Sequence, residues 1–192
     1  MILVSFASLA QNKLEYRLAV GDTFTVYQEA KQLITQDING VDQIIQNDLK
    51  GSMHFEVLSA TPENYTLSMS FKRLKMLMTS PSLGELSNAD TDSADSTDIT
   101  NMLFKGILNI PVSIVMERTG KIKSVTGGDK LIANIIMTLS GTQTTSVIIN
   151  PTNGLFKEIT TTGENSGDTM IQAQNMTIPT HISSTITYKI SQ

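Results

Sequence analysis

The stretch Phe24-Thr-Val-Tyr-Gln-Glu-Ala-Lys-Gln-Leu-Ile-Thr-Gln-Asp-Ile-Asn-Gly-Val41 decides the fold of this chain. Its even-numbered positions form one face, as expected of a β-strand with period two. That face carries the apolar residues Phe24, Val26, Ala30, Ile34 and Ile38, together with Gln28, Gln32 and Gln36. Asn39-Gly40 then predicts a tight hairpin, because both central positions of a type I′ turn need a positive φ.

Two further strands continue the hairpin. One runs from Val41 to Ser59 and the other from Tyr65 to Met78, after the turn Thr61-Pro-Glu-Asn64. In the later strand the apolar positions change parity, from Tyr65, Leu67, Met69 and Phe71 to Leu74, Met76 and Met78. Because a slip of one residue exchanges the two faces of a strand, we predict a β-bulge near residues 72 to 74.

Shorter patterns extend the sheet on both sides. Strands are predicted at Leu14–Val20, Ile110–Glu117, Lys121–Thr126, Thr144–Ile149, Leu155–Thr161, Thr169–Gln174 and Ile178–Ile190. Ser80 to Thr97 and Gly163 to Gly167 are predicted to be loops because they are rich in Gly, Ser, Asp and Asn.

Two segments have helical spacing instead. One contains Ile99, Met102, Leu103 and Phe104 and is ended by Gly106. The other, Lys130 to Met137, opens after Gly127-Gly128-Asp129 and has a broad apolar stripe. The expected fold is mainly β (α+β): a curved antiparallel sheet or half-open barrel with two short helices on one face.

The first ten residues resemble the end of a secretory signal peptide. An apolar run is followed by small residues, with cleavage expected after Ala10. We therefore expect residues 1–10 to be a signal-peptide remnant, residues 11–192 to form a single β-rich domain, and the protein to be periplasmic or secreted. The chain has no Cys, which excludes disulfides, thiol chemistry and acylation at a lipoprotein cysteine.

The composition limits the classes of partner that this protein can bind. The net charge of −4 provides no basic face for nucleic acid, and no apolar run approaches the roughly 20 residues of a transmembrane helix.

The acidic loop has two interpretations: a calcium-binding loop, or a solvated loop that enters a helix N-terminus. Its acidic residues are Asp90, Asp92, Asp95 and Asp98. His54 and His181 are not in a metal-type spacing, and no catalytic motif is present. We expect neither a cofactor nor an enzyme.

The methionines suggest a binding surface. Met is flexible and suits a loosely specified apolar ligand, although an ordinary core is the alternative. The candidate ligand-binding residues are Met53, Met69, Phe71, Met76, Met78, Met102 and Phe104.

Several segments resemble uncharacterised exported proteins of Bacteroidetes, of the DUF6263 type. They are Leu14-Glu-Tyr-Arg-Leu-Ala-Val-Gly-Asp-Thr-Phe24, Phe104-Lys-Gly-Ile-Leu with Pro111-Val-Ser-Ile, Thr119-Gly-Lys-Ile with Gly127-Gly128, and Asn153-Gly-Leu with Ile178-Pro and Thr187-Tyr188. The resemblance implies no activity. At fold level the pattern also resembles periplasmic lipoprotein carriers, which hold acyl chains in a half-barrel under helices.

Two functions follow as hypotheses. The first is an exported non-enzymatic protein that binds an apolar or amphiphilic, lipid-like ligand between the curved sheet and the helices. The alternative is a structural or protein-interaction module that contacts an envelope protein.

Overall fold

The computed structural model describes residues 15–93, 99–128, 135–171 and 176–191. Its strands form a nine-stranded sheet in the order β6-β5-β3-β2-β1-β9-β8-β7, with β4 pairing with β3 beyond the end of β5. The elements are β1 Thr23–Ile38, β2 Val41–Ala60, β3 Asn64–Ser80, β4 Gly84–Asp90, α1 Ile99–Ile107, β5 Val112–Glu117, β6 Ile122–Thr126, β7 Ile135–Ile149, β8 Phe156–Ile171 and β9 Met176–Ser191.

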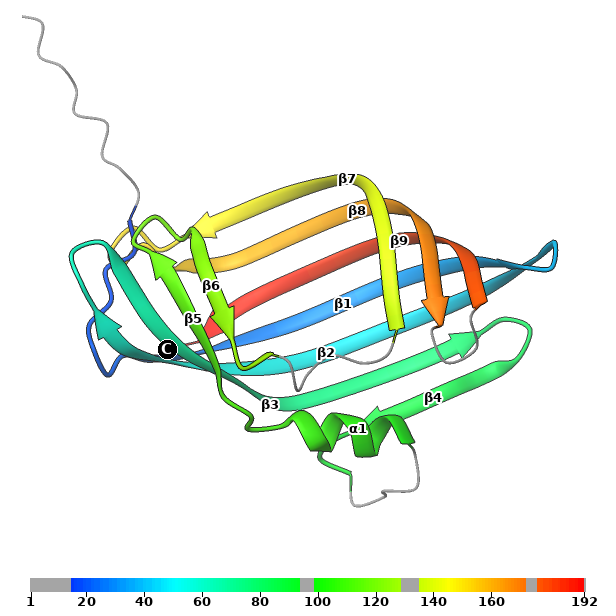
Figure 1. Ribbon diagram of the computed structural model, residues 1–192, viewed down its shortest axis with the longest axis horizontal. Coiled ribbons are helices and arrows are strands. Elements are labelled where there is room, and N and C mark those ends of the chain that lie inside the picture. The colour runs from blue at the N-terminus through cyan, green and yellow to red at the C-terminus, as the bar shows by residue number, and fades with distance from the viewer. Residues whose placement is uncertain (1–14, 94–98, 129–134, 172–175, 192) are drawn as a thin grey trace, which may run out of the picture.

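The sheet is antiparallel and strongly curved. Strands β7, β8 and β9 arch over β1, β2 and β3, so the sheet forms a half-barrel (Figure 1). This confirms the mainly β, curved antiparallel architecture. Among the described residues, no helix is long and apolar enough to cross a membrane.

The central hairpin forms as predicted. Asn39 and Gly40 have φ values of 57° and 80°, and they connect β1 to β2 in a continuous register. The β-bulge is also confirmed: Ser52 pairs with Arg73 and Met53 pairs with Phe71, which leaves Lys72 without a ladder partner. The bulge keeps Phe71 and Leu74 on the same face of β3, and this face is the concave one.

One end of the half-barrel is closed by a packed core. Its buried members are Leu18, Phe24, Val26, Val57, Tyr65, Leu67 and Leu155. Tyr65 is fully buried, and its hydroxyl donates to the Tyr16 carbonyl (2.9 Å) and accepts from the Leu18 amide (3.2 Å). Arg118 donates to the same hydroxyl (2.8 Å) and places its guanidinium 4.8 Å from the centre of the Tyr65 ring.

The predicted strand Leu14–Val20 is wrong for the part that is described. Residues 15–19 have no regular structure, and they cross the closed end of the half-barrel. Their backbone groups bond to separate partners, since Tyr16 donates to the Arg118 carbonyl and Arg17 to the Asn153 carbonyl. The alternation of apolar residues therefore reflects docking onto the core, while Val20 is 63% exposed.

Two predicted loops are largely strand. The segment predicted as a loop from Ser80 to Thr97 contains β4, and residues 94–98 lie outside the described chain. Strand β8 continues through Gly163 and Gly167, each paired with both neighbouring strands. In both segments the polar and glycine-rich composition hid the strand, because cross-strand pairing outweighed local propensity.

The prediction of two helices holds for the first only. Helix α1 is confirmed and is the one α-helix among the described residues. It lies against β4, where Ser87 donates a hydrogen bond to Thr100 (3.3 Å). The second helix is wrong at Ile135 to Met137, which begin β7, and its remaining residues fall outside the described chain.

Candidate functional site

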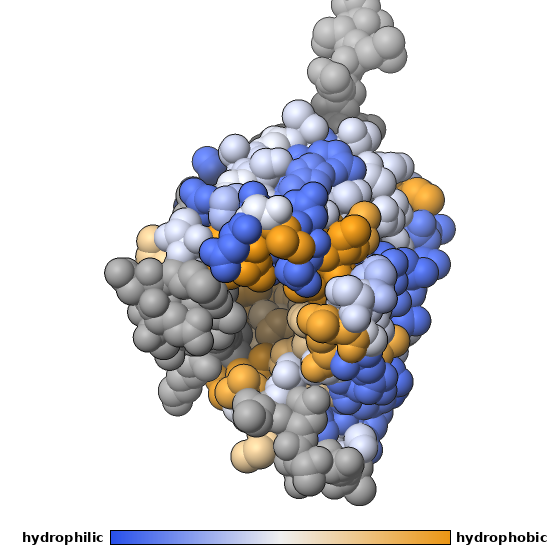
Figure 2. Space-filling model, turned by 90° about the vertical axis from the view of Figure 1, so that its right-hand side faces the viewer, coloured by the Kyte–Doolittle hydropathy of each residue, from blue (hydrophilic) through white to orange (hydrophobic). Residues whose placement is uncertain are grey.

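The end of the half-barrel opposite the packed core is hollowed. Figure 2 looks into this end and shows a depression with hydrophobic residues at its rim and inside it. The hairpin tips at this end carry exposed apolar side chains: Ile38 (38% exposed), Val41 (58%) and Leu83 (68%). The concave side of the sheet forms the wall of this hollow. Its apolar residues there include Ile34, Ile45, Leu49, Met76, Met78 and Ile186.

Within the part of the chain that the structure describes, no charged residue that is paired in a strand ladder lies on the concave face. Cross-strand partners point to the same face, so the registers assign every paired residue to one side. All charged residues that the ladders pair, such as Glu29, Lys50 and Glu164, fall on the convex side. The concave positions hold apolar residues, glycines and uncharged hydroxyl or amide side chains. This separation suits an interior that excludes ions.

The structure brings five of the predicted ligand-binding residues onto this face. Met53 pairs with Phe71, Met69 with Phe55, Met76 with Leu49 and Met78 with Asn47. Met53 packs against the closed core, whereas Met76 and Met78 lie on the stretch of β3 next to β4. On α1, Met102 is 58% exposed and Phe104 is half-buried.

Sequence reasoning missed the contribution of the strands on the other side of β2. Ile34 of β1 and the isoleucines Ile182 and Ile186 of β9 share the concave face with the methionines. Their period-two spacing was visible in the sequence. The pairing of β1 with β9 was not visible in the sequence, because it joins residues more than a hundred positions apart.

If the methionines lie beside open space, truncating Met78 should lower the free energy of unfolding only slightly. We expect Met78→Ala to lower the free energy of unfolding by about 1 kcal/mol or less, because a side chain beside a cavity makes fewer dispersion contacts. Leu67→Ala, in the packed end, should cost about 2–5 kcal/mol. Urea unfolding of both variants compares them, and equal losses would mean that Met78 is ordinary core.

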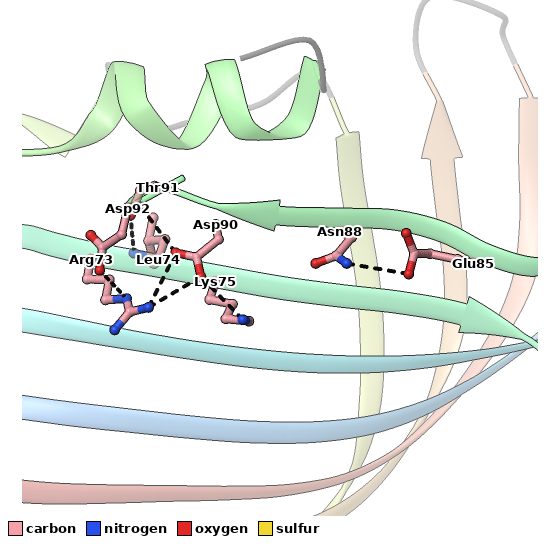
Figure 3. Close-up of polar contacts among 8 residues, drawn as sticks. All are labelled: Arg73, Leu74, Lys75, Glu85, Asn88, Asp90, Thr91 and Asp92. Atoms are coloured by element: carbon pink, nitrogen blue, oxygen red, sulfur yellow. Dashed lines mark hydrogen bonds and ion pairs between the residues drawn. The ribbon is translucent and has the colours of Figure 1, made fainter. Parts of the chain in front are cut away.

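Basic residues of β3 hold the acidic segment at the end of β4, which contains Asp90 and Asp92. Asp90 contacts Arg73 (3.3 Å) and Lys75 (3.2 Å), and Asp92 contacts Arg73 (2.9 Å) (Figure 3). Burial raises the pKa of Asp90, but the Asp92 amide and the two cations outweigh it, so the pKa is lowered overall. No metal-holding group of three or more acidic, His or Cys residues occurs in the described chain, and Asp95 and Asp98 lie outside it.

His181 belongs to a hydrogen-bonded network on the convex face. Its Nδ1 lies 2.9 Å from the Ser166 hydroxyl and its Nε2 lies 3.1 Å from Glu164, which also accepts from Ser183 (2.7 Å). The His181 and Glu164 side chains are 49% and 59% exposed. These residues face one another across the β8–β9 ladder, so we interpret them as cross-strand surface contacts.

This chain is similar to a family of unknown function and to a solved structure. No curated protein matches the chain. Among solved structures, a DUF1329 family protein from Desulfovibrio piger is 10% identical over 88% of this chain and 84% of that chain, with a TM-score of 0.12. The model of DUF6263, a family of unknown function, matches residues 62–146. The part of the chain from the turn before β3 into β7 is therefore similar to the DUF6263 family.

Proposed function

We propose that this protein binds the hydrocarbon part of an apolar or amphiphilic, lipid-like ligand in the hollow between the curved sheet and α1. Two observations carry the proposal: an open hollow with an apolar rim, and a concave face on which no described residue of the strand ladders is charged. Ligand pockets of this kind are mostly apolar, with a few polar groups that orient the ligand.

The same lining supports binding rather than catalysis. Acid–base and nucleophilic catalysis need a titratable or activated group within reach of the substrate. The ladder-paired concave positions that are described carry no Asp, Glu, His, Lys or Arg. We therefore include the absence of enzymatic activity in the proposal.

Export to the periplasm or the exterior is the third part of the proposal. It rests on the apolar run and small residues of Met1 to Ala10. Analysis of the N-terminus of protein isolated from its own host tests this part independently of ligand binding.

A matched pair of charge insertions tests the binding. Ile45 is half-buried on the concave face, and Gln46, the next residue, is exposed on the convex face. We expect Ile45→Glu to weaken binding of the fluorescent apolar probe N-phenyl-1-naphthylamine at least about tenfold, because a carboxylate beside bound hydrocarbon loses its hydration. Gln46→Glu adds the same charge and should leave the affinity unchanged.

Circular dichroism and thermal unfolding establish that both variants are folded before titration. A folded Ile45→Glu protein with the wild-type affinity would place the probe elsewhere and contradict the proposal.

A second candidate function is a protein-interaction module of the cell envelope. Strand β7 ends the strand order and pairs only with β8 among the described elements. A free strand edge can accept an added strand from a partner. Pull-down of one envelope protein by the wild-type chain, with loss of that protein when the β7 edge carries a proline, favours this function.

A further inference from the structure

From β7 to β2 the concave face has a row of polar residues and a glycine, between two rows that are apolar on β9, β1 and β2. Directly paired residues of β7, β8, β9, β1 and β2 cross the sheet in the order Gln143, Gly163, Ser184, Gln32, Asn47. The apolar row on one side contains Ile186, Ala30, Leu49 and Met76. The row on the other side contains Ile182, Ile34 and Ile45.

Asn47 has an unused hydrogen-bond acceptor in this row. The residue is only 9% exposed, and its Nδ2 donates to Gln32 Oε1 at 2.8 Å. Its Oδ1 is buried and has no hydrogen-bond partner in the described structure. A buried amide oxygen is destabilising unless it accepts a hydrogen bond, so Asn47 Oδ1 is a candidate acceptor for a donor that reaches the concave face.

We propose that Asn47 and Gln32 form a polar subsite that receives an uncharged hydroxyl or amide donor of the ligand. The flanking apolar rows then contact hydrocarbon on both sides of that group. A charged headgroup does not fit here, since the paired concave residues of the described chain include no counter-ion. This inference rests on the proposed function and adds the chemical class: a lipid-like molecule with an uncharged hydrogen-bond donor, such as a monoacylglycerol.

Two probes with the same acyl chain test the subsite. 1-Oleoylglycerol has free hydroxyl donors, and methyl oleate has none. Each displaces N-phenyl-1-naphthylamine from the wild-type protein, and we expect 1-oleoylglycerol to bind about three- to tenfold more tightly, the gain from one neutral hydrogen bond.

Replacing Asn47 should remove this preference. Asn47→Leu is expected to bind both esters equally, with methyl oleate held at least as tightly as by the wild type. The matched control is Gln46→Leu, which changes the neighbouring residue on the convex face and should keep the preference. If Asn47→Leu does not fold, Asn47→Ala removes the same carboxamide without adding bulk.

Three outcomes distinguish failure of the polar subsite from failure of the proposed function. Loss of the preference in the Asn47 variant, with retention in Gln46→Leu, supports the subsite. The subsite is overturned if the wild type binds both esters equally, or if the preference survives in the Asn47 variant. Failure of the wild type to bind either ester overturns the proposed function itself.

Discussion

Replacing Tyr65 with alanine is expected to lower the free energy of unfolding by about 3–5 kcal/mol. Tyr65 is the largest side chain that is fully buried among the described residues, and it lies in the core that closes one end of the half-barrel. Its removal leaves a cavity that β3 and β5 cannot close, because both strands are held in their ladders.

Tyr65→Phe isolates the contribution of the hydroxyl. Without it, the Leu18 amide and the Tyr16 carbonyl lose their partner, and Arg118 loses one acceptor. Buried backbone groups left unpaired cost about 1–3 kcal/mol, so we expect a loss in this range and release of residues 15–19 from the closed end.

Chemical denaturation measures both variants, and hydrogen exchange at Leu18 reports the release. Tyr27→Ala serves as the control, since Tyr27 is 52% exposed on the convex face. A Tyr65→Phe protein with wild-type stability and a protected Leu18 amide would mean that core packing alone holds the segment.

Gly141→Ala is expected to destabilise the protein by about 3 kcal/mol, the upper part of the range for overpacking. A Cβ at residue 141 would overlap the Glu164 carbonyl oxygen and lie 2.7 Å from the Asn165 Cα. These atoms belong to the backbone of β8, the only partner of β7 among the described strands, so they cannot move aside without breaking the ladder.

Gly106→Ala is the matched control for this substitution. Gly106 lies in α1 with open space around its Cβ position. Alanine there should raise the stability by about 0.5–1 kcal/mol, since it is the better helix former. Equal and small effects of the two substitutions in thermal unfolding would contradict the close approach of β7 to β8.

The central hairpins could be predicted because local signals agreed with the final pairing. Alternation set the faces of β1 and β2, Asn39-Gly40 specified the turn, and the parity change after Phe71 revealed the bulge. Strand β4 has no alternation of apolar and polar residues from which it could have been predicted. Its paired residues on the concave side are the small residues Gly84, Ser87 and Ala89, which is typical of a short edge strand beside a helix.

Other errors arose where one pattern fits two structures. Ile135, Ile136 and Leu139 have spacings compatible with a helix, but the ladder with β8 makes them part of a strand. Periodicity alone cannot separate these cases in a short apolar run.

The candidate site was predictable in part. The methionines of β3 and the glutamines of β1 could be assigned to one face from their spacing. The polar row through Asn47 could not, because it depends on the registers of five strands and on the long-range pairing of β1 with β9.

Native mass spectrometry of the protein purified gently from its own host tests most directly whether the hollow holds a lipid-like ligand. We predict a noncovalent adduct on the wild-type protein that organic extraction removes and identifies as a lipid, and that is absent from Ile45→Glu. A known lipid carrier treated in parallel establishes that the conditions preserve such complexes. A wild-type protein that carries only its own mass, while the carrier retains its lipid, would contradict the account.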